Sequence, residues 1–215
     1  IEVVLEAYGS DFDTKLSAGM GSGDTPDVVY MWNYPAYADG LEPLDEYIDK
    51  EGEEYKDNFY STLWNYNSFD DTTYGIPVGF TTHALFYNKD LFAEAGVEEP
   101  TDSWTWSDLQ TAAKTIEEKT GQKGFAFQMK PDPYDFEMYL WSNGAAYCDE
   151  EGVMAGKIDS KESQEVFQMF QDMEKDGYAI ATEKNGTDEF RAGTAAMYIY
   201  GSWSINSLDE DGMNY

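Results

Sequence analysis

The order of apolar runs and helical patterns constrains the fold of this chain more than any other feature of its sequence. The opening segment "IEVVLEAY" and the unbroken apolar run "DVVYMW" (residues 27–32) are typical of buried strands. A short helical pattern with Phe12 and Leu16 on its inward side lies between them. A strand, a helix and a second parallel-type strand make a βαβ unit, so the sequence predicts an α/β fold built on an open, doubly wound sheet.

The second half of the chain continues the alternation of helices and strands. Thr105 and Gly121 bracket the helical pattern "TWSDLQTAAKTIEEKTG", and Ser160 and Gly177 bracket the stronger pattern "SKESQEVFQMFQDMEKDG". Shorter helices are predicted in "PYDFEMYLWSNGA" and in "TDEFRAG", the latter capped by Thr187. The segments "KGFAFQM" and "AAMYIYG" are predicted strands.

The segment "GIPVGFTTHALFYNKDLF" (residues 75–92) predicts one strand over 76–80 and another over 84–87. Between them lie Thr81, Thr82 and His83, the only histidine of the chain. Taken alone, these residues favour a hydrogen-bonded core histidine beside two threonines suited to extended backbone.

The charge balance excludes several classes of partner. The 215 residues carry 43 Asp and Glu against 13 Lys and Arg, a formal net charge of −30. Nucleic acids and anionic membrane surfaces are bound through clusters of basic residues, which this sequence lacks. No apolar run reaches the ~18–20 residues of a membrane span. Most of the carboxylates are expected to form a solvated surface, and a cationic ligand is the alternative that they leave open.

The sequence predicts neither a metal site nor a cofactor. One His and one Cys cannot form a His/Cys metal centre, and Cys148 has no partner for an internal disulfide. The segments "DEEG" and "DEDG" lack the alternating ligands of a calcium loop, and no G-x-S-x-G motif is present. A glycoside hydrolase stays open because it needs only two suitably spaced carboxylates.

Aromatic residues make up 16% of the chain, with 17 Tyr and 6 Trp. This excess of Tyr and Trp suits a surface that contacts flat, partly apolar molecules rich in hydroxyl groups. Ligands of open α/β sheets bind beyond the carboxyl ends of the strands. The candidates at such positions are Trp32, Asn33, Tyr34, Asp132, Tyr134, Glu137 and Trp203, with Trp141 as a further one.

Five segments in sequence order carry a resemblance to a known family: "TPDVVYMW", "AYADGLEPLDEYI", "YGIPVGFTTHALFYNKDLF", "TWSDLQTAAKTI" and "FRAGTAAMYIYGSW". The chain resembles the family 1 extracellular solute-binding proteins of bacterial ABC transporters, and most closely their maltose-binding-protein-like, carbohydrate-binding branch. The resemblance covers essentially the whole chain. It implies a two-lobed, type II periplasmic-binding-protein-like fold with doubly wound mixed sheets, of which this chain is a central part, incomplete at both ends.

The same resemblance implies a division of the chain into part of lobe one (1–80), a crossover (81–83) and part of lobe two (84–215). Thr81, Thr82 and His83 would then lie on the floor of a cleft between the lobes. Trp203 matches the family's cleft tryptophan and Tyr134 its cleft tyrosine. Where the maltose-binding branch presents a glutamate at the crossover, this chain has threonine near position 81, so the identity of the sugar is not carried over.

The implied function is that of a non-catalytic, extracellular or periplasmic protein that captures an oligosaccharide between its lobes and delivers it to the transmembrane subunits of an ABC transporter. A lipid anchor outside this chain would attach it to the membrane. The alternatives are the same fold with a polyamine or another cation as its ligand, and a glycoside hydrolase. Exposed sheet edges also predict an exchange of elements between copies of the chain.

Overall fold

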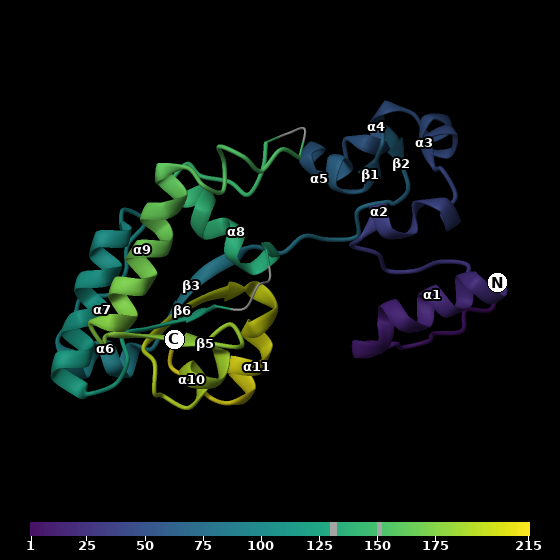
Figure 1. The fold of residues 1–215 in the computed structure, drawn as a ribbon. Coiled ribbons are helices and arrows are strands. Elements are labelled where there is room, and N and C mark those ends of the chain that lie inside the picture. Colours follow the sequence, from purple (N-terminus) through teal and green to yellow (C-terminus); the bar gives the residue numbers. More distant parts are fainter. Residues whose placement is uncertain (130–132, 150–151) are drawn as a thin grey trace. The chain divides into compact units, whose positions relative to one another are not determined.

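The computed structural model describes residues 1–129, 133–149 and 152–215, the side chains of Ser10, Pro133 and Asp135 excepted. The chain divides into two compact units, Ile1–Phe80 and Thr81–Tyr215 (Figure 1). Each unit is described by itself.

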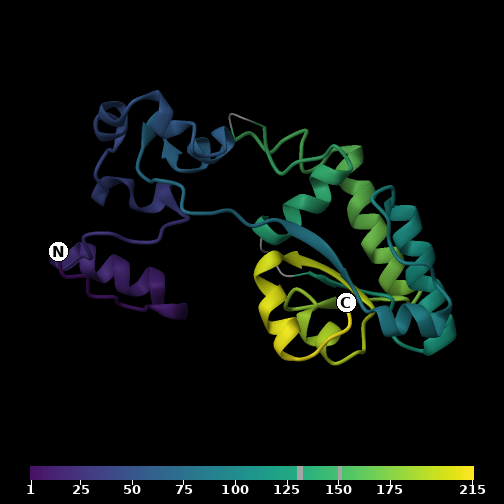
Figure 2. The same ribbon diagram turned by 180° about the vertical axis from the view of Figure 1, so that it is seen from behind.

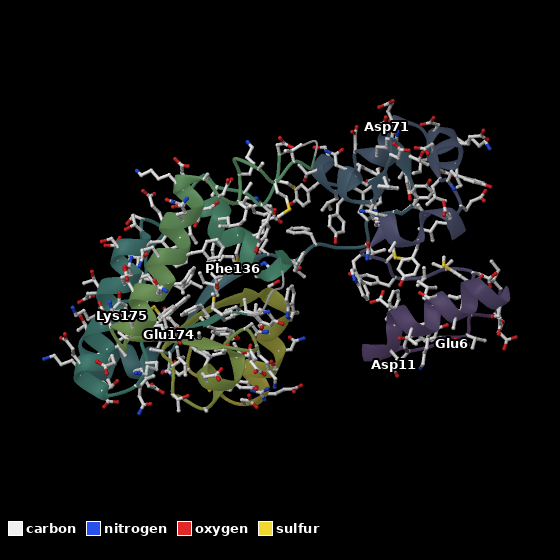
Figure 3. The ribbon with its side chains drawn as sticks, in the orientation of Figure 1. Glu6, Asp11, Asp71, Phe136, Glu174 and Lys175 are labelled. Atoms are coloured by element: carbon white, nitrogen blue, oxygen red, sulfur yellow. The ribbon has the colours of Figure 1, made fainter. Side chains whose placement is uncertain are left out.

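The first unit consists of short helices and one small hairpin. Its elements are η1 (Gly9–Asp11), α1 (Phe12–Ser22), α2 (Tyr34–Tyr37), η2 (Ala38–Gly40), α3 (Asp45–Glu51), α4 (Glu53–Lys56), α5 (Ser61–Tyr66), β1 (Ser68–Phe69) and β2 (Thr72–Thr73). The hairpin turns through Asp70 and Asp71, which both have positive φ (51° and 59°), as a two-residue turn of the primed type requires. Asp71 projects from the tip of this hairpin in Figure 3.

Buried tyrosines hold the first unit together. Tyr34 is buried, and its hydroxyl donates to Oδ1 of Asn67 at 2.5 Å. The hydroxyl of the buried Tyr37 donates to Oδ1 of Asp13 at 2.6 Å. These two bonds connect α2 to the start of the hairpin on one side and to α1 on the other, and both phenol groups are thereby satisfied.

Three predicted strands are absent from the first unit. Residues 1–8, 27–32 and 76–80 have no strand assignment, and most of their apolar side chains are exposed, namely those of Ile1, Val3, Val4, Leu5, Val28, Tyr30, Ile76, Val78 and Phe80. An apolar run becomes a strand only where a neighbour completes its backbone hydrogen bonds. Within the described residues none of the three segments pairs with a strand, so the predictions for them were wrong. Helix α1 runs four residues into "GMGSG" (residues 19–23), as far as Ser22, and ends at the left-handed Gly23.

The second unit is a mixed sheet covered by helices on both faces. In chain order it contains β3 (His83–Tyr87), α6 (Lys89–Ala95), α7 (Trp106–Thr120), β4 (Phe125–Gln128), α8 (Pro133–Ser142), α9 (Lys161–Lys175), β5 (Ala179–Thr182), α10 (Thr187–Arg191), β6 (Met197–Gly201), η3 (Ser202–Ser204) and α11 (Ile205–Glu210). The strand order is β3-β6-β4-β5. Strand β4 is parallel to both of its neighbours, and β3 is antiparallel to β6.

Alternation along the strands creates two cores. Phe125 and Phe127 face the larger core beneath α6, α7, α8 and α9, whereas Ala126 faces the smaller core beneath α10 and α11. Figure 1 and the reverse view in Figure 2 show these two groups of helices on opposite sides of the sheet. Phe136 points from α8 into the larger core (Figure 3), where its ring stacks on Phe167 with 5.1 Å between centroids. The second unit is therefore doubly wound, as predicted.

Helix caps follow the sequence closely in this unit. Thr105 and Asp108 form a capping box at the start of α7, and the hydroxyl of Ser160 accepts from the N–H of Ser163 at the start of α9. The prediction for Thr187 was wrong, because Thr187 is the first residue of α10 and the left-handed Gly186 precedes it.

Candidate ligand-binding site

One edge of the second unit's sheet collects the segments that carry candidate residues. Strands β4, β5 and β6 run in the same direction, so their carboxyl ends lie at this edge. Because β3 is antiparallel to β6, its first residue also lies there, with His83 paired to Gly201. Open α/β sheets bind their ligands at such an edge.

A short turn at this edge carries Trp203. After Gly201 the chain enters η3, and two hydrogen bonds hold the turn in place. The N–H of Ser202 donates to the carbonyl oxygen of Thr82 at 2.9 Å, and the hydroxyl of Ser204 donates to the carbonyl oxygen of Gly201 at 3.0 Å. The turn is thereby fixed both to the end of β6 and to the segment that leads into β3.

Four aromatic rings meet around this turn, and we call His83, Tyr134, Tyr200 and Trp203 the ring cluster. The indole of Trp203 lies 5.6 Å from the imidazole of His83 and 5.0 Å from the ring of Tyr200, with interplanar angles of 83° and 80°. Tyr134, on α8, lies 6.1 Å from His83. Edge-to-face pairs at these separations are a favoured aromatic geometry, which makes the cluster a defined arrangement rather than a chance gathering.

The ring cluster is accessible although it is packed. Tyr134 is 61% exposed and Trp203 is 45% exposed, while His83 is half-buried. Large aromatic rings that stay partly open beside a sheet edge offer flat apolar faces to a ligand. A pyranose ring, with C–H faces and a rim of hydroxyl groups, is complementary to such a surface.

Polar groups lie on the segments next to the ring cluster. Thr81 and Thr82 are exposed and directly precede His83. Glu137 lies one helical turn after Tyr134 and is half-buried, and this burial raises the pKa of its carboxyl group. Hydroxyl and carboxylate groups can exchange hydrogen bonds with the hydroxyls of a ligand. Asp132, a further candidate, lies outside the described residues.

Trp141 and the candidates of the first unit are not part of the ring cluster. Trp141 is exposed and lies seven residues after Tyr134 on α8, close to two full turns and so on the same side of that helix. In the first unit Trp32 is 48% exposed and its ring lies tilted against that of Phe12, with 4.4 Å between ring centroids, and Asn33 is exposed. The buried Tyr34 serves the packing of its own unit. That residues of both units meet at one ligand stays a prediction.

Sequence reasoning missed Tyr200 and Gly201. Alternation along "MYIYG" places Tyr200 on the side of the strand opposite Met197 and Ile199, and its position next to the strand's end could have marked it. The pairing of β3 with β6, which brings His83 beside Gly201, has no local signal in the sequence.

A surface hollow elsewhere in the second unit does not include the ring cluster. It has a volume of about 390 Å³ and is lined by residues of α7 and α9 together with Asn143, which follows α8. Its carboxylates already have partners, since Glu165 pairs with Lys161 at 3.1 Å and Asp172 accepts from Gln168 at 2.8 Å. These groups are not left to attract a ligand, and the ring cluster is the better candidate.

Metal binding and membrane insertion find no support in the part of the chain that the structure describes. Those residues contain no group of three or more His, Cys, Asp or Glu side chains placed to hold a metal ion. None of the described helices is long and apolar enough to cross a membrane.

The comparison with known proteins agrees with the fold. The arabinooligosaccharide-binding protein of Halalkalibacterium halodurans is 28% identical over 80% of this chain and 39% of its own length. The sn-glycerol-3-phosphate-binding periplasmic protein of Brucella abortus is 25% identical over 99% of this chain and 53% of its own length. An ABC substrate-binding protein from Listeria monocytogenes, solved in complex with cycloalternan, is 26% identical, with a TM-score of 0.78 over 96% of this chain and 55% of its own.

The chain spans about half the length of the curated relatives it matches. The family model described as bacterial extracellular solute-binding protein matches residues 1–215, the whole chain. Together with the mixed, doubly wound sheet of the second unit, this match shows that the chain belongs to the bacterial extracellular solute-binding protein family.

Proposed function

We propose that the protein containing this chain captures an oligosaccharide and delivers it to an ABC transporter. The observation that carries the proposal is the ring cluster, in which Trp203 and Tyr134 stay exposed at the ligand-binding edge of the sheet. Exposed aromatic rings of this kind can stack on the C–H faces of a sugar. The nearby Thr81, Thr82 and Glu137 supply hydrogen-bonding groups for the sugar's hydroxyl groups.

The charge of the chain supports a neutral solute over a phosphorylated one. Relatives with different solutes occur in the family, including one named for sn-glycerol-3-phosphate. A phosphate ester is held by Arg and Lys groups, whereas this chain has a net charge of −30 and 13 basic residues among 215. The general field therefore opposes an anionic ligand and leaves the binding of a neutral sugar unaffected.

Residues 81–83 are proposed as the hinge of the protein. Thr81 and Thr82 are exposed and have no strand or helix assignment, and the division between the two compact units falls directly before Thr81. A short segment of this kind can absorb the changes in φ and ψ that a closing motion requires. Ligand contacts on both sides of a hinge would favour the closed state over the open one.

The proposed partners of the protein and its location are inferred from the family. We infer that the closed protein is recognised by the transmembrane subunits of the transporter and acts outside the cytoplasmic membrane, held there by a lipid anchor. The family is described as solute-binding, so the proposal includes no catalytic step.

Isothermal titration calorimetry of the complete protein tests this function. The panel would contain maltotriose, mannotriose, arabinotriose and cycloalternan, with glycerol 3-phosphate and spermidine as contrasting solutes. We expect a dissociation constant in the micromolar range or below, about −8 kcal/mol or tighter, for at least one oligosaccharide. Binding of spermidine or of glycerol 3-phosphate alone would contradict the proposal, as would the appearance of shortened sugars after long incubation.

A further inference from the structure

Gly201 lacks a side chain where the ring of Trp203 lies. A Cβ atom added to Gly201 would lie 2.2 Å from Cη2, 2.2 Å from Cζ3 and 2.4 Å from Cε3 of that indole. These separations are far below the ~3.5–4.0 Å at which carbon atoms make favourable contacts. Any other residue at position 201 would therefore collide with the ring.

The three distances also show whether the added Cβ would meet the edge or the face of the indole. An atom in the plane of a ring and beyond its rim is much nearer to one ring atom than to that atom's two neighbours. The added Cβ would instead be almost equally distant from three successive ring atoms, so it would lie over the face of the indole. One face of Trp203 consequently rests against the end of β6 and is not available for stacking on a ligand.

The backbone itself does not require glycine at this position. Gly201 has φ −72° and ψ 149°, an extended conformation that all residues adopt. Gly144, Gly177 and Gly186 in the same unit differ, because their φ values of 73°, 88° and 87° lie in the left-handed region. The contact with the indole is thus the physical reason for a glycine at 201.

We propose that Gly201 is a positioning residue for ligand binding, which holds Trp203 flat against β6 so that one defined face of the indole meets the ligand. The inference rests on the proposed function. The rings of His83 and Tyr200 also contact the indole, and both lie nearly perpendicular to it. A side chain at 201 would displace the indole from this arrangement and leave the strand itself intact.

A first experiment needs no ligand. The indole N–H resonance of Trp203 in the complete protein is identified by its loss in Trp203→Phe, and its chemical shift is then compared between the unaltered protein and Gly201→Ala. We expect the resonance to move, because the ring leaves its place between His83 and Tyr200. Gly21→Ala is the matched control, because a Cβ there meets nothing within 4 Å. A resonance that stays in place in Gly201→Ala would overturn the proposal.

A second experiment measures binding of maltotriose and mannotriose by calorimetry in a double-mutant cycle. We expect Gly201→Ala to weaken binding at least about tenfold and to have no further effect once Trp203 is alanine. Additive losses would overturn the positioning role. If neither trisaccharide binds the unaltered protein, the proposed function loses its support for these sugars, and the resonance alone decides the role of Gly201.

Failure of Gly201→Ala to fold would also be informative. The ring that causes the collision is absent from Gly201→Ala/Trp203→Ala, so this double variant should unfold at the same temperature as Trp203→Ala. A double variant that is still unfolded would show that Gly201 serves the strand rather than the indole, and would contradict the proposal.

Discussion

His83 lies directly opposite Gly201 in the antiparallel pair of β3 and β6. This pairing places the first residue of β3 beside the last residue of β6, and it brings an imidazole to within 5.6 Å of the Trp203 indole. The candidate site therefore depends on a contact between residues more than a hundred positions apart in the sequence.

Trp203→Ala should weaken the binding of an oligosaccharide by about 1–3 kcal/mol, the value of burying one large apolar side chain. The reason is the loss of the exposed indole face at the sheet edge. Calorimetry with the tightest-binding sugar of the panel measures the effect. Trp203→Phe keeps a smaller aromatic face and should lose less, and an unchanged affinity in Trp203→Ala would remove this residue from the site.

Binding should depend little on salt if the solute is a neutral sugar. Raising the ionic strength from about 0.01 M to about 1 M shortens the Debye length from about 30 Å to about 3 Å and so screens the field of a chain with charge −30. Calorimetric titrations at both ionic strengths provide the test. A strong weakening at high salt would favour a cationic solute instead.

Glu137→Gln should raise stability at neutral pH and weaken sugar binding. Burial raises the pKa of this carboxyl group above its value in the unfolded chain. The favourable contribution of Glu137 to the free energy of unfolding is therefore fully present below the pKa that the group has in the unfolded chain. It is lost as the pH rises through the higher pKa of the folded state. The variant's advantage in melting temperature should be present at pH 7 and vanish in acid, and an equal advantage at both pH values would refute this explanation.

Gly124→Ala and Gly21→Ala should change stability in opposite directions. A Cβ at Gly124 would lie 2.1–2.4 Å from backbone atoms of Ala113 on α7, which cannot move aside as a side chain can. We expect a loss of at least about 1–3 kcal/mol from this overpacking. At Gly21, within α1, a Cβ meets open space and should add about 0.5–1 kcal/mol. Denaturant unfolding of the two variants under the same conditions makes the comparison.

Thr105→Ala should destabilise the protein by about 0.5–2 kcal/mol through the loss of the cap of α7. The hydrogen bonds from Thr105 also hold the pKa of Asp108 below its ordinary value. A depressed pKa contributes stability above the unfolded pKa that is lost as the pH falls through the folded pKa. The variant should therefore lose less stability on acidification than the unaltered protein does, as acid unfolding curves would record. Similar curves for both would contradict the role of Thr105 in the cap.

The sequence predicts the elements of the second unit well because their signals are local. Thr105 and Ser160 accept backbone N–H groups three residues ahead, and the inward residues of α7 and α9 recur with the period of a helix. The strands predicted for the apolar runs at 1–8 and 27–32 are absent because a strand does not depend on local signals alone. A strand is defined by the hydrogen bonds of its neighbour, and no described segment provides them.

The residues of the candidate site likewise differ in whether a local signal in the sequence marks them. Tyr134 and Trp203 could be named from the sequence because each follows a predicted strand, and both prove to be exposed. Tyr200 and Gly201 could not, because their roles depend on how rings and backbone meet in three dimensions. The buried position of Tyr34 likewise follows from its bond to Asn67, which lies 33 residues away.

The hydrogen bond from the N–H of Ser202 to the carbonyl oxygen of Thr82 connects the backbone that precedes β3 directly to the turn that carries Trp203. A fluorophore attached at the exposed position 81 would therefore lie one residue from that bond and next to the proposed sugar contacts. The emission of such a label should change when a sugar binds at the ring cluster. The junction of β3 and β6 is therefore a suitable place to build a fluorescent biosensor.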